Sequence, residues 1–211
     1  AEYSLDEGTT WNPIAPVDGS FDSPSEDVGA EFSVQNPGVY EACVRATDSC
    51  GSTGSQECML LAVYDPVGGF VTGGGWIDSP EGAYTLAPSL AGKASFGFVS
   101  KYKKGASVPT GNTEFNFKAG GLNFHSDTYD WLVVTGSDYA RFKGSGTING
   151  LQAPNEQDYK FMLWAGDGTG VDGADTFRIK IWWEEGDTEH LVYDNGMDQA
   201  IGGGSIVVHT K

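Results

Sequence analysis

Short runs in which apolar and polar residues alternate dominate this chain, and this period-two pattern is the feature that most limits its fold. The runs are interrupted by Gly, Pro, Asn and Asp, and glycine alone supplies 31 of the 211 residues. Helical periodicity is almost absent. The pattern predicts an all-β protein whose short strands are joined by many tight turns, as in β-sandwiches and related architectures.

The charge balance excludes several classes of partner. The chain has 29 acidic residues against 12 Lys and Arg, which gives a net charge of −17. Binding to phosphates depends on cations that displace counterions, so we expect no nucleic-acid partner. Anionic membrane surfaces are disfavoured for the same reason, and no apolar run reaches the length of about 18 residues that membrane insertion requires. We interpret the acidic surface as solvated, and as compatible with divalent cations and neutral glycans.

A cluster of turn-forming residues, YDPVGG at 64–69, divides the chain. We therefore expect one domain over residues 1–65 and a second over residues 66–211. Many connections in the second domain are too short for helical crossovers, so neighbouring strands should pair antiparallel. The expected fold of this domain is a jelly-roll-like, two-sheet sandwich of about ten strands. These strands are expected near residues 70–77, 93–103, 112–118, 121–126, 129–135, 138–149, 157–166, 175–184, 189–194 and 203–210.

A hairpin is predicted in the first domain, around the turn SCGSTGS at 49–55. Folding about this turn brings Cys43 opposite Cys58, so we predict a cross-strand disulfide, with Cys50 left free at the tip. A disulfide that closes a loop of about 15 residues stabilises a fold by roughly 3 kcal/mol in the chain-entropy model. The cysteines lie on the face opposite the expected core face, which is formed by Tyr40, Ala42, Val44 and Ala46.

Three segments of the first domain, YSLDEGTTW, VDGSFDSPSEDV and PGVYEACVRATDSCGSTG, resemble the later strands of an immunoglobulin-like repeat of large bacterial surface proteins. The resemblance covers residues 1 to about 65 and implies an Ig-like sandwich that lacks its opening strands. Because such a sandwich exposes unpaired edges, we expect either a piece of a longer polypeptide or a strand supplied by another copy. The candidate segment for intermolecular pairing is the N-terminal strand, made of Glu2, Tyr3, Ser4, Leu5 and Asp6.

The second domain contains the phrases GGFVTGGGWIDSPEGAY, GKASFGFVSKYKKGASVPTGNTEFNF, LNFHSDTYDWLVV, DTFRIKIW, VYDNG and GGGSIVVH. They resemble a glycine-rich β domain that lies near the C-terminal end of long secreted bacterial proteins. In such proteins it follows immunoglobulin-like, PKD or choice-of-anchor repeats. The resemblance implies an architecture and an extracellular location, and it implies no chemistry.

One loop holds three aspartates among glycines, in the segment WAGDGTGVDGADTFRIKIWW at 164–183. Both flanks alternate like strands, so the loop is predicted to connect a hairpin. Calcium takes six to eight oxygen ligands, and DGTGVDGAD resembles a single unit of the nonapeptide calcium β-roll. A simple turn and a calcium site both remain open, whereas a catalytic loop is disfavoured. The candidate calcium ligands are Asp167, Asp172 and Asp175.

Two tryptophans of this hairpin, Trp164 and Trp182, fall on the face opposite its expected core face. An exposed tryptophan ring can stack on a sugar ring, and the alternative is that other groups cover both faces of each ring. The only basic run in the sequence is SKYKKG at 100–105, which we interpret as a solvated turn.

Residues for catalysis are sparse. The triplet His125-Ser126-Asp127 has the letters of a triad, but adjacent side chains of a strand point to opposite faces. The glycine runs GGGW at 73–76 and GGGS at 202–205 lack the helix that a phosphate loop needs, and we expect them to permit close strand packing. We therefore expect no enzyme activity.

These patterns predict a non-enzymatic, extracellular structural or adhesive module of a bacterial surface protein or filament. Its expected partners are neighbouring copies or adjacent domains of a longer parent chain, joined by strand addition. The alternative is a calcium-stabilised carbohydrate-binding module, which would use the three aspartates for the ion and Trp164 or Trp182 for the glycan. No cofactor other than calcium is expected.

Overall fold

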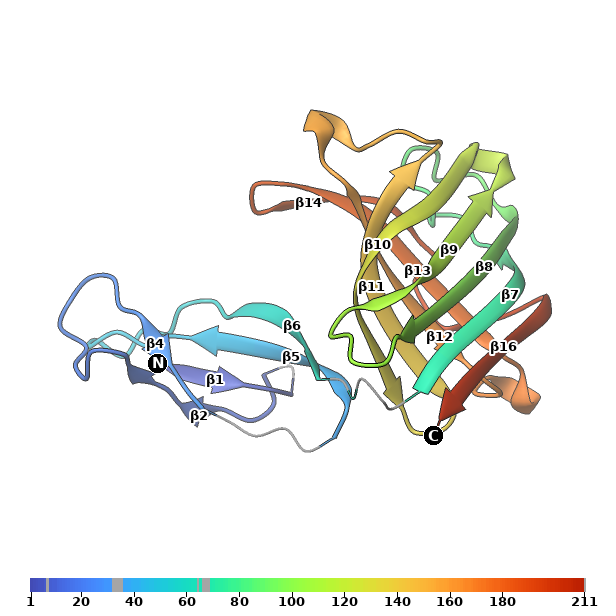
Figure 1. The fold of residues 1–211 in the computed structure, drawn as a ribbon. Coiled ribbons are helices and arrows are strands. Elements are labelled where there is room, and N and C mark those ends of the chain that lie inside the picture. The colour runs from blue at the N-terminus through green and yellow to red at the C-terminus, as the bar shows by residue number, and fades with distance from the viewer. Residues whose placement is uncertain (7, 32–35, 64, 66–68, 211) are drawn as a thin grey trace. The chain divides into compact units, whose positions relative to one another are not determined.

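The computed structural model describes residues 1–6, 8–31, 36–63, 65 and 69–210, which form two compact units, Ala1–Val63 and Tyr64–Lys211 (Figure 1). The predicted domain boundary lies between residues 65 and 66, and of these two residue 66 is outside the described residues. Both units are built from β-strands. The described helices are three short 3₁₀ turns at Lys118–Gly120, Pro154–Glu156 and Val171–Gly173, and none is long and apolar enough to cross a membrane.

The N-terminal unit contains a four-stranded antiparallel sheet in the order β2-β1-β5-β6. A separate pair of two-residue strands, β3 and β4, lies outside this sheet. The predicted hairpin is present as β5 and β6, which pair from Val44 opposite Glu57 to Gly38 opposite Val63. The strands are β1 Glu2–Ser4, β2 Asn12–Pro13, β3 Ala15–Pro16, β4 Val28–Gly29, β5 Gly38–Arg45 and β6 Glu57–Val63.

Very little of the N-terminal unit is buried. Among its described residues only Ser4 and Cys43 are inaccessible to solvent, and both lie on the disulfide face of the sheet. The expected core face is therefore wrong as a core: Val44 is 37% exposed, Ala46 is exposed, and Tyr40 and Ala42 are only half-buried. The apolar face is only partly covered in the described part of the unit, because Val44 lines an open hollow together with Phe21 and Val28.

The second unit is one curled antiparallel sheet of ten strands, which Figure 1 shows wrapping around its own inner face. Strands that follow one another in sequence pair with one another from β7 to β14, and β16 returns to pair with β7. The predicted all-β class and the antiparallel pairing are confirmed, and the strand order is that of a meander. The strands are β7 Gly69–Ser79, β8 Gly92–Tyr102, β9 Pro109–Phe117, β10 Leu122–Thr135, β11 Tyr139–Ile148, β12 Tyr159–Gly166, β13 Thr176–Glu185, β14 Thr188–Asp194, β15 Gln199–Ala200 and β16 Gly203–Thr210.

Two of the expected strands, near 121–126 and 129–135, form the single long strand β10. Its pairing with β11 shifts register between Ser126 and Thr128 and again between Tyr129 and Trp131. Such bulges bend a strand without ending it, which explains why the alternation is interrupted although the strand continues.

The inner face of the curled sheet is filled by aromatic side chains. The rings of Phe96 and Phe177 stack with centroids 3.9 Å apart, and Tyr193, which is fully buried, donates a 2.8 Å hydrogen bond to Ser79. Because each buried aromatic side chain removes a large apolar area from water, this cluster is the main source of stability in the unit. The other fully buried phenylalanines are Phe115, Phe117, Phe124, Phe142 and Phe161.

The glycine runs allow the close packing that the sequence predicts. A Cβ atom on Gly73 would lie 2.5 Å from the Phe98 ring, and one on Gly75 would lie 2.3 Å from the carbonyl oxygen of Gly203. Both distances are far below van der Waals contact, so only glycine fits where β7 passes between β8 and β16.

Candidate functional site

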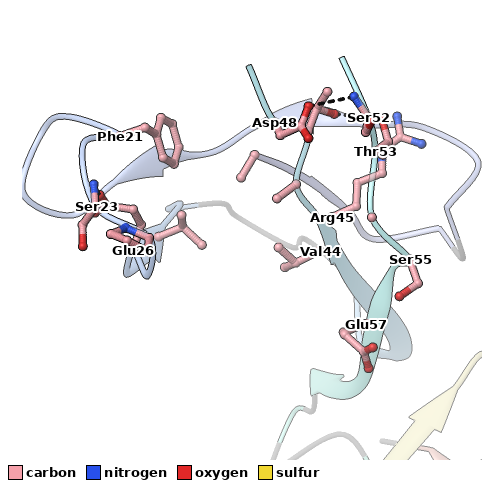
Figure 2. A pocket seen from close by; sticks show the side chains of 16 residues that line it. Phe21, Ser23, Glu26, Val44, Arg45, Asp48, Ser52, Thr53, Ser55 and Glu57 are labelled. Atoms are coloured by element: carbon pink, nitrogen blue, oxygen red, sulfur yellow. Dashed lines mark hydrogen bonds between the residues drawn. The ribbon is translucent and has the colours of Figure 1, made fainter. Parts of the chain in front are cut away.

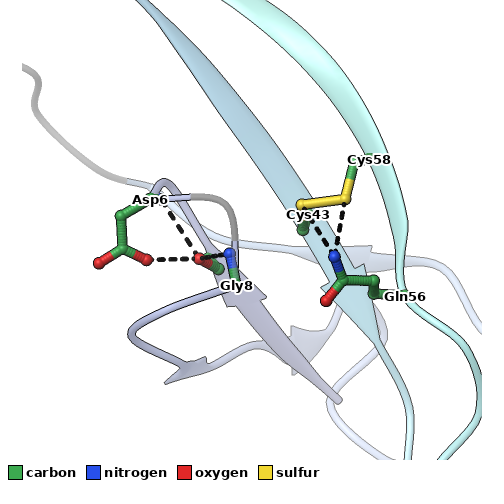
Figure 3. The surroundings of a disulfide bond; sticks show 6 residues. Asp6, Gly8, Cys43, Gln56 and Cys58 are labelled. Atoms are coloured by element: carbon green, nitrogen blue, oxygen red, sulfur yellow. Dashed lines mark hydrogen bonds between the residues drawn. A yellow bond between two sulfur atoms is a disulfide. The ribbon is translucent and has the colours of Figure 1, made fainter.

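The predicted disulfide is present in the N-terminal unit. Cys43 on β5 and Cys58 on β6 are directly opposite one another and are bonded, whereas Cys50 is free and exposed (Figure 3). The amide of Gln56 donates to the Cys58 sulfur at 3.4 Å. Structural disulfides are typical of oxidising compartments, so the pairing indicates a non-cytoplasmic environment.

A compact turn follows β1. The Ser4 hydroxyl donates to a carboxylate oxygen of Asp6 at 2.7 Å and accepts the backbone N–H of Gly8 at 2.9 Å. Asp6 in turn accepts hydrogen bonds from the hydroxyl and the backbone N–H of Thr10. These bonds, with that from the Thr10 hydroxyl as the largest, lower the pKa of Asp6 to about 2. The turn therefore fixes the end of β1 locally.

The N-terminal strand does not have the free edge that intermolecular pairing requires. Glu2 and Tyr3 pair with β2 on one side and with β5 on the other, and Ser4 pairs with Cys43. The Glu2 carboxylate also binds Arg45 at 2.8 Å. Pairing of residues 2–6 with a neighbouring copy is therefore disfavoured, because Glu2 and Tyr3 already use both of their edges inside their own sheet.

The free edge of this sheet belongs to β6. Among the described residues its one partner strand is β5, and its sequence, ECMLLAV, carries exposed apolar side chains on both faces. Met59 is 71% exposed and Leu60 is 48% exposed. At the opposite edge, β2 is only two residues long and includes Pro13, which has no N–H to donate. Sequence reasoning marked β6 as a hairpin strand but could not show which strand would stay unpaired.

An open hollow of about 790 Å³ lies at the turn end of the β5–β6 hairpin, in the same unit (Figure 2). Phe21 and Val44 contribute apolar surface to it, and Glu26, Asp48 and Glu57 contribute carboxylates. Phe21 is 56% exposed. Apolar surface that is left open in this way is available for contact with a partner.

The three aspartates of the loop between β12 and β13 have two different roles. Asp175 accepts the backbone N–H of Ile206 at 2.7 Å through one oxygen and that of Gly168 at 2.9 Å through the other. Asp167 accepts the backbone N–H of Val208 at 3.1 Å. Ile206 and Val208 are alternate residues of β16, so the two carboxylates cover the edge of β16 that β7 leaves free. We call this pair of aspartates the β16 latch.

The third aspartate, Asp172, is exposed and is not part of the latch. It lies in the 3₁₀ turn with a φ of 59°, a conformation that Asn and Asp tolerate better than most residues. Within the described residues, the one grouping of His, Cys, Asp and Glu with metal-like spacing is Glu41 with Cys43 and Cys58, whose sulfurs are already bonded together. Calcium binding at Asp167, Asp172 and Asp175 stays a prediction, and the latch gives two of these residues a role without an ion.

The two tryptophans lie on the outer face of the curled sheet, as the alternation predicts, but in different environments. Trp182 is only 5% exposed, donates to Glu184 at 2.9 Å, and has the ammonium groups of Lys143 and Lys180 within 5.6 and 5.0 Å of its ring centroid. Trp164 is half-buried, with the Arg178 guanidinium 4.5 Å from its ring. Trp182 is thus covered and Trp164 is partly accessible.

These contacts belong to a group of five cations that sequence reasoning missed. The sequence contains only one basic run, near residue 103, whereas the fold collects cations from three separate strands. The signal was available in the alternation, because each cation takes an outward position on its strand. The residues are Arg141 and Lys143 on β11, Lys160 on β12, and Arg178 and Lys180 on β13. We call this surface the cationic face.

The histidines are far from a catalytic arrangement in the described residues. His190 stacks on Trp183 at 4.1 Å and His209 stacks on Phe70 at 4.0 Å. His125 is half-exposed beside Glu114, 3.7 Å away. Packing and surface charge account for each ring.

Comparisons with protein-family models, with curated proteins and with solved structures find no match to this chain. The features of this chain that bear on its function are the free β6 edge, the β16 latch and the cationic face.

Proposed function

We propose that this chain is a non-enzymatic structural or adhesive module of an extracellular bacterial surface protein or filament, and that it assembles with copies of itself by strand addition at β6. The observation that carries the proposal is the free edge of β6 in a unit whose described residues bury little apolar surface. An exposed, apolar edge strand is a ready template for another strand, since it offers unpaired N–H and C=O groups.

The sequence of β6 favours a second copy as the added strand. If two β6 strands pair antiparallel about Leu60, then Leu60 faces its own counterpart, Met59 faces Leu61, and Glu57 faces Val63. This register places apolar residues opposite one another and brings no like charges together. The arrangement is two-fold symmetric, which is the commonest symmetry of homo-oligomers.

Two observations support an extracellular location for the module. The disulfide joins β6, the strand that would form the interface, to β5, and such bonds form in oxidising compartments. The resemblance of both units to parts of secreted bacterial repeat proteins supports the same location.

The test is the mass of the native chain in solution, measured by light scattering across protein concentration. We expect a dimer from the natural chain and a monomer from Leu60→Lys, because a buried, unpaired lysine at the symmetry axis would oppose its counterpart. Leu151→Lys is the matched control, since Leu151 is 69% exposed in the other unit. A chain that is monomeric at every concentration would refute the proposal.

A cross-linking test examines the register itself. In a Cys50→Ser background, Leu60→Cys should form a disulfide-linked dimer under mild oxidation, because position 60 meets itself in the symmetric pair. Leu86→Cys, at a position that is 77% exposed, should not do so beyond the background of random collision. Equal cross-linking at both positions would contradict the β6 register.

A further inference from the structure

The cationic face is unusual in so acidic a chain. It holds five of the 12 Lys and Arg residues on three adjacent strands of one sheet. The residues are aligned in cross-strand rows. Arg141, Trp164 and Arg178 form one row, Lys143, Met162 and Lys180 form the next, and Ser145, Lys160 and Trp182 form the third.

Two of the five cations have carboxylate partners. Arg178 binds Asp194 through two hydrogen bonds of 3.1 and 2.9 Å, and Lys180 binds Glu189 at 2.7 Å. These pairs lie at the β14 side of the face.

The other three cations, Arg141, Lys143 and Lys160, have no carboxylate within 4.0 Å in the part of the chain that the structure describes. They lie on β11 and β12, away from the paired side. Adjacent strands are about 4.8 Å apart, so the three positive groups form a compact set. These three cations are therefore free of direct ion pairs, although the carboxylates of Asp158 and Glu184 contact Ser145 and Trp182 in the third row.

The floor of the face is apolar and rigid. Met162 is 4% exposed and Trp182 is 5% exposed, although both point away from the main core. The side chains of Lys143 and Lys180 lie over the Trp182 ring, which holds their ammonium groups by cation–π attraction. Cations that are held in this way lose little conformational entropy when they bind an anion.

We propose that the cationic face binds an anionic polysaccharide, that is, a chain of sugars with carboxylate or sulfate groups. The acidic groups would contact Arg141, Lys143 and Lys160. A sugar ring would stack on the part of the Trp164 ring that the Arg178 guanidinium, 4.5 Å from its centroid, leaves accessible. Charge-assisted hydrogen bonds to such anions are the stronger class. The negative charges elsewhere on the chain act weakly here, because salt at physiological strength screens charges beyond about 8 Å.

The position of Trp164 favours a sugar over an acidic protein surface. An Asp or Glu carboxylate would satisfy the cations equally well, but these side chains offer no ring with a face of C–H groups to stack on the indole. The site lies on the second unit and is independent of assembly at β6, so either proposal can fail without the other.

The experiment measures binding of the natural chain to polygalacturonate, heparin, neutral dextran and poly-glutamate, by calorimetric titration at low and physiological salt. We expect binding to one or both acidic polysaccharides, none to dextran, and weaker binding to poly-glutamate. Lys143→Gln with Lys160→Gln should weaken polysaccharide binding by at least about tenfold, since each change removes one charge-assisted contact. The matched control is Lys101→Gln with Lys103→Gln, which removes the same charge elsewhere and should leave the affinity unchanged.

Trp164→Ala distinguishes the ligand classes. It should weaken binding of the polysaccharide and leave any binding of poly-glutamate unaltered. The thermal unfolding of each variant shows whether it is folded. The proposal would be overturned if the chain bound neither acidic polysaccharide, or if the two pairs of lysine substitutions lowered the affinity equally. It would also be overturned if poly-glutamate bound as tightly as the polysaccharides. The last result would assign the face to an acidic protein.

Discussion

Replacement of Asp175 tests the β16 latch. Its carboxylate accepts two backbone N–H groups, from Ile206 and Gly168, and the bond to Ile206 spans 31 positions of sequence. Asp175→Ala removes both acceptors and leaves a donor of β16 without a partner. Asp175→Asn keeps one oxygen but places an NH₂ group against an N–H group, so it should lower the free energy of unfolding by about half as much as Asp175→Ala.

The magnitude follows from the number of bonds. A hydrogen bond to a charged group contributes about 1.5–3 kcal/mol, and the half-buried position of Asp175 favours the lower value. Asp175→Ala should therefore cost about 3 kcal/mol, and Asp175→Asn about 1.5 kcal/mol. In a unit of this size, about 1 kcal/mol corresponds to roughly 2–4 °C, so the melting temperature should fall by about 6–12 °C and 3–6 °C respectively.

The assay is scanning calorimetry of each variant with and without added calcium, and the matched control is Asp172→Asn. Asp172 lies in the same loop but outside the latch, and asparagine tolerates its positive φ, so this change should be nearly neutral. Equal effects at Asp172 and Asp175 would refute the latch. A large rise in the melting temperature with calcium that both substitutions abolish would instead support the calcium site, because a bound ion stabilises the folded state.

Three further predictions concern the fold. Because the pKa of Asp6 is lowered to about 2, its carboxylate stabilises the N-terminal unit above a pH of about 4, and this contribution is lost as the pH falls toward 2. Thr10→Val removes the main cause of the lowered pKa, so the stability of this unit should depend less steeply on pH in acid unfolding followed by circular dichroism. Reduction of the disulfide should destabilise the same unit by about 3 kcal/mol and leave the second unit's transition unmoved, and a shift of both transitions would contradict their independence. Gly144→Ala should cost about 1–3 kcal/mol in urea unfolding, since a Cβ would lie 2.1 Å from the carbonyl oxygen of Thr128, whereas Gly97→Ala, with nothing within 4 Å, is the control.

The strands, the hairpin and the disulfide could be predicted because their signals are local. Alternation over eight residues identifies a strand, and the turn at 49–55 determines that Cys43 meets Cys58. The outward positions of Trp164 and Trp182 follow from the same alternation. These features need only the period of a strand and the geometry of one turn.

The latch and the cationic face could not be predicted because they depend on contacts between distant segments. Asp167 meets Val208 across 41 positions of sequence, which only the curl of the whole sheet brings about. Trp182 is covered because the register of three strands places Lys143 near its ring, and no pattern within one strand contains that register. The free edge at β6 likewise depends on the order of strands in the sheet.

The central claim is that β6 is an assembly edge, and the most direct measurement is light scattering of the native chain beside Leu60→Lys and Leu151→Lys. We predict that the natural chain and Leu151→Lys form dimers, with a mean mass that rises with concentration toward that of the dimer, whereas Leu60→Lys stays a monomer. A monomeric natural chain, or assembly that persists in Leu60→Lys, would contradict it.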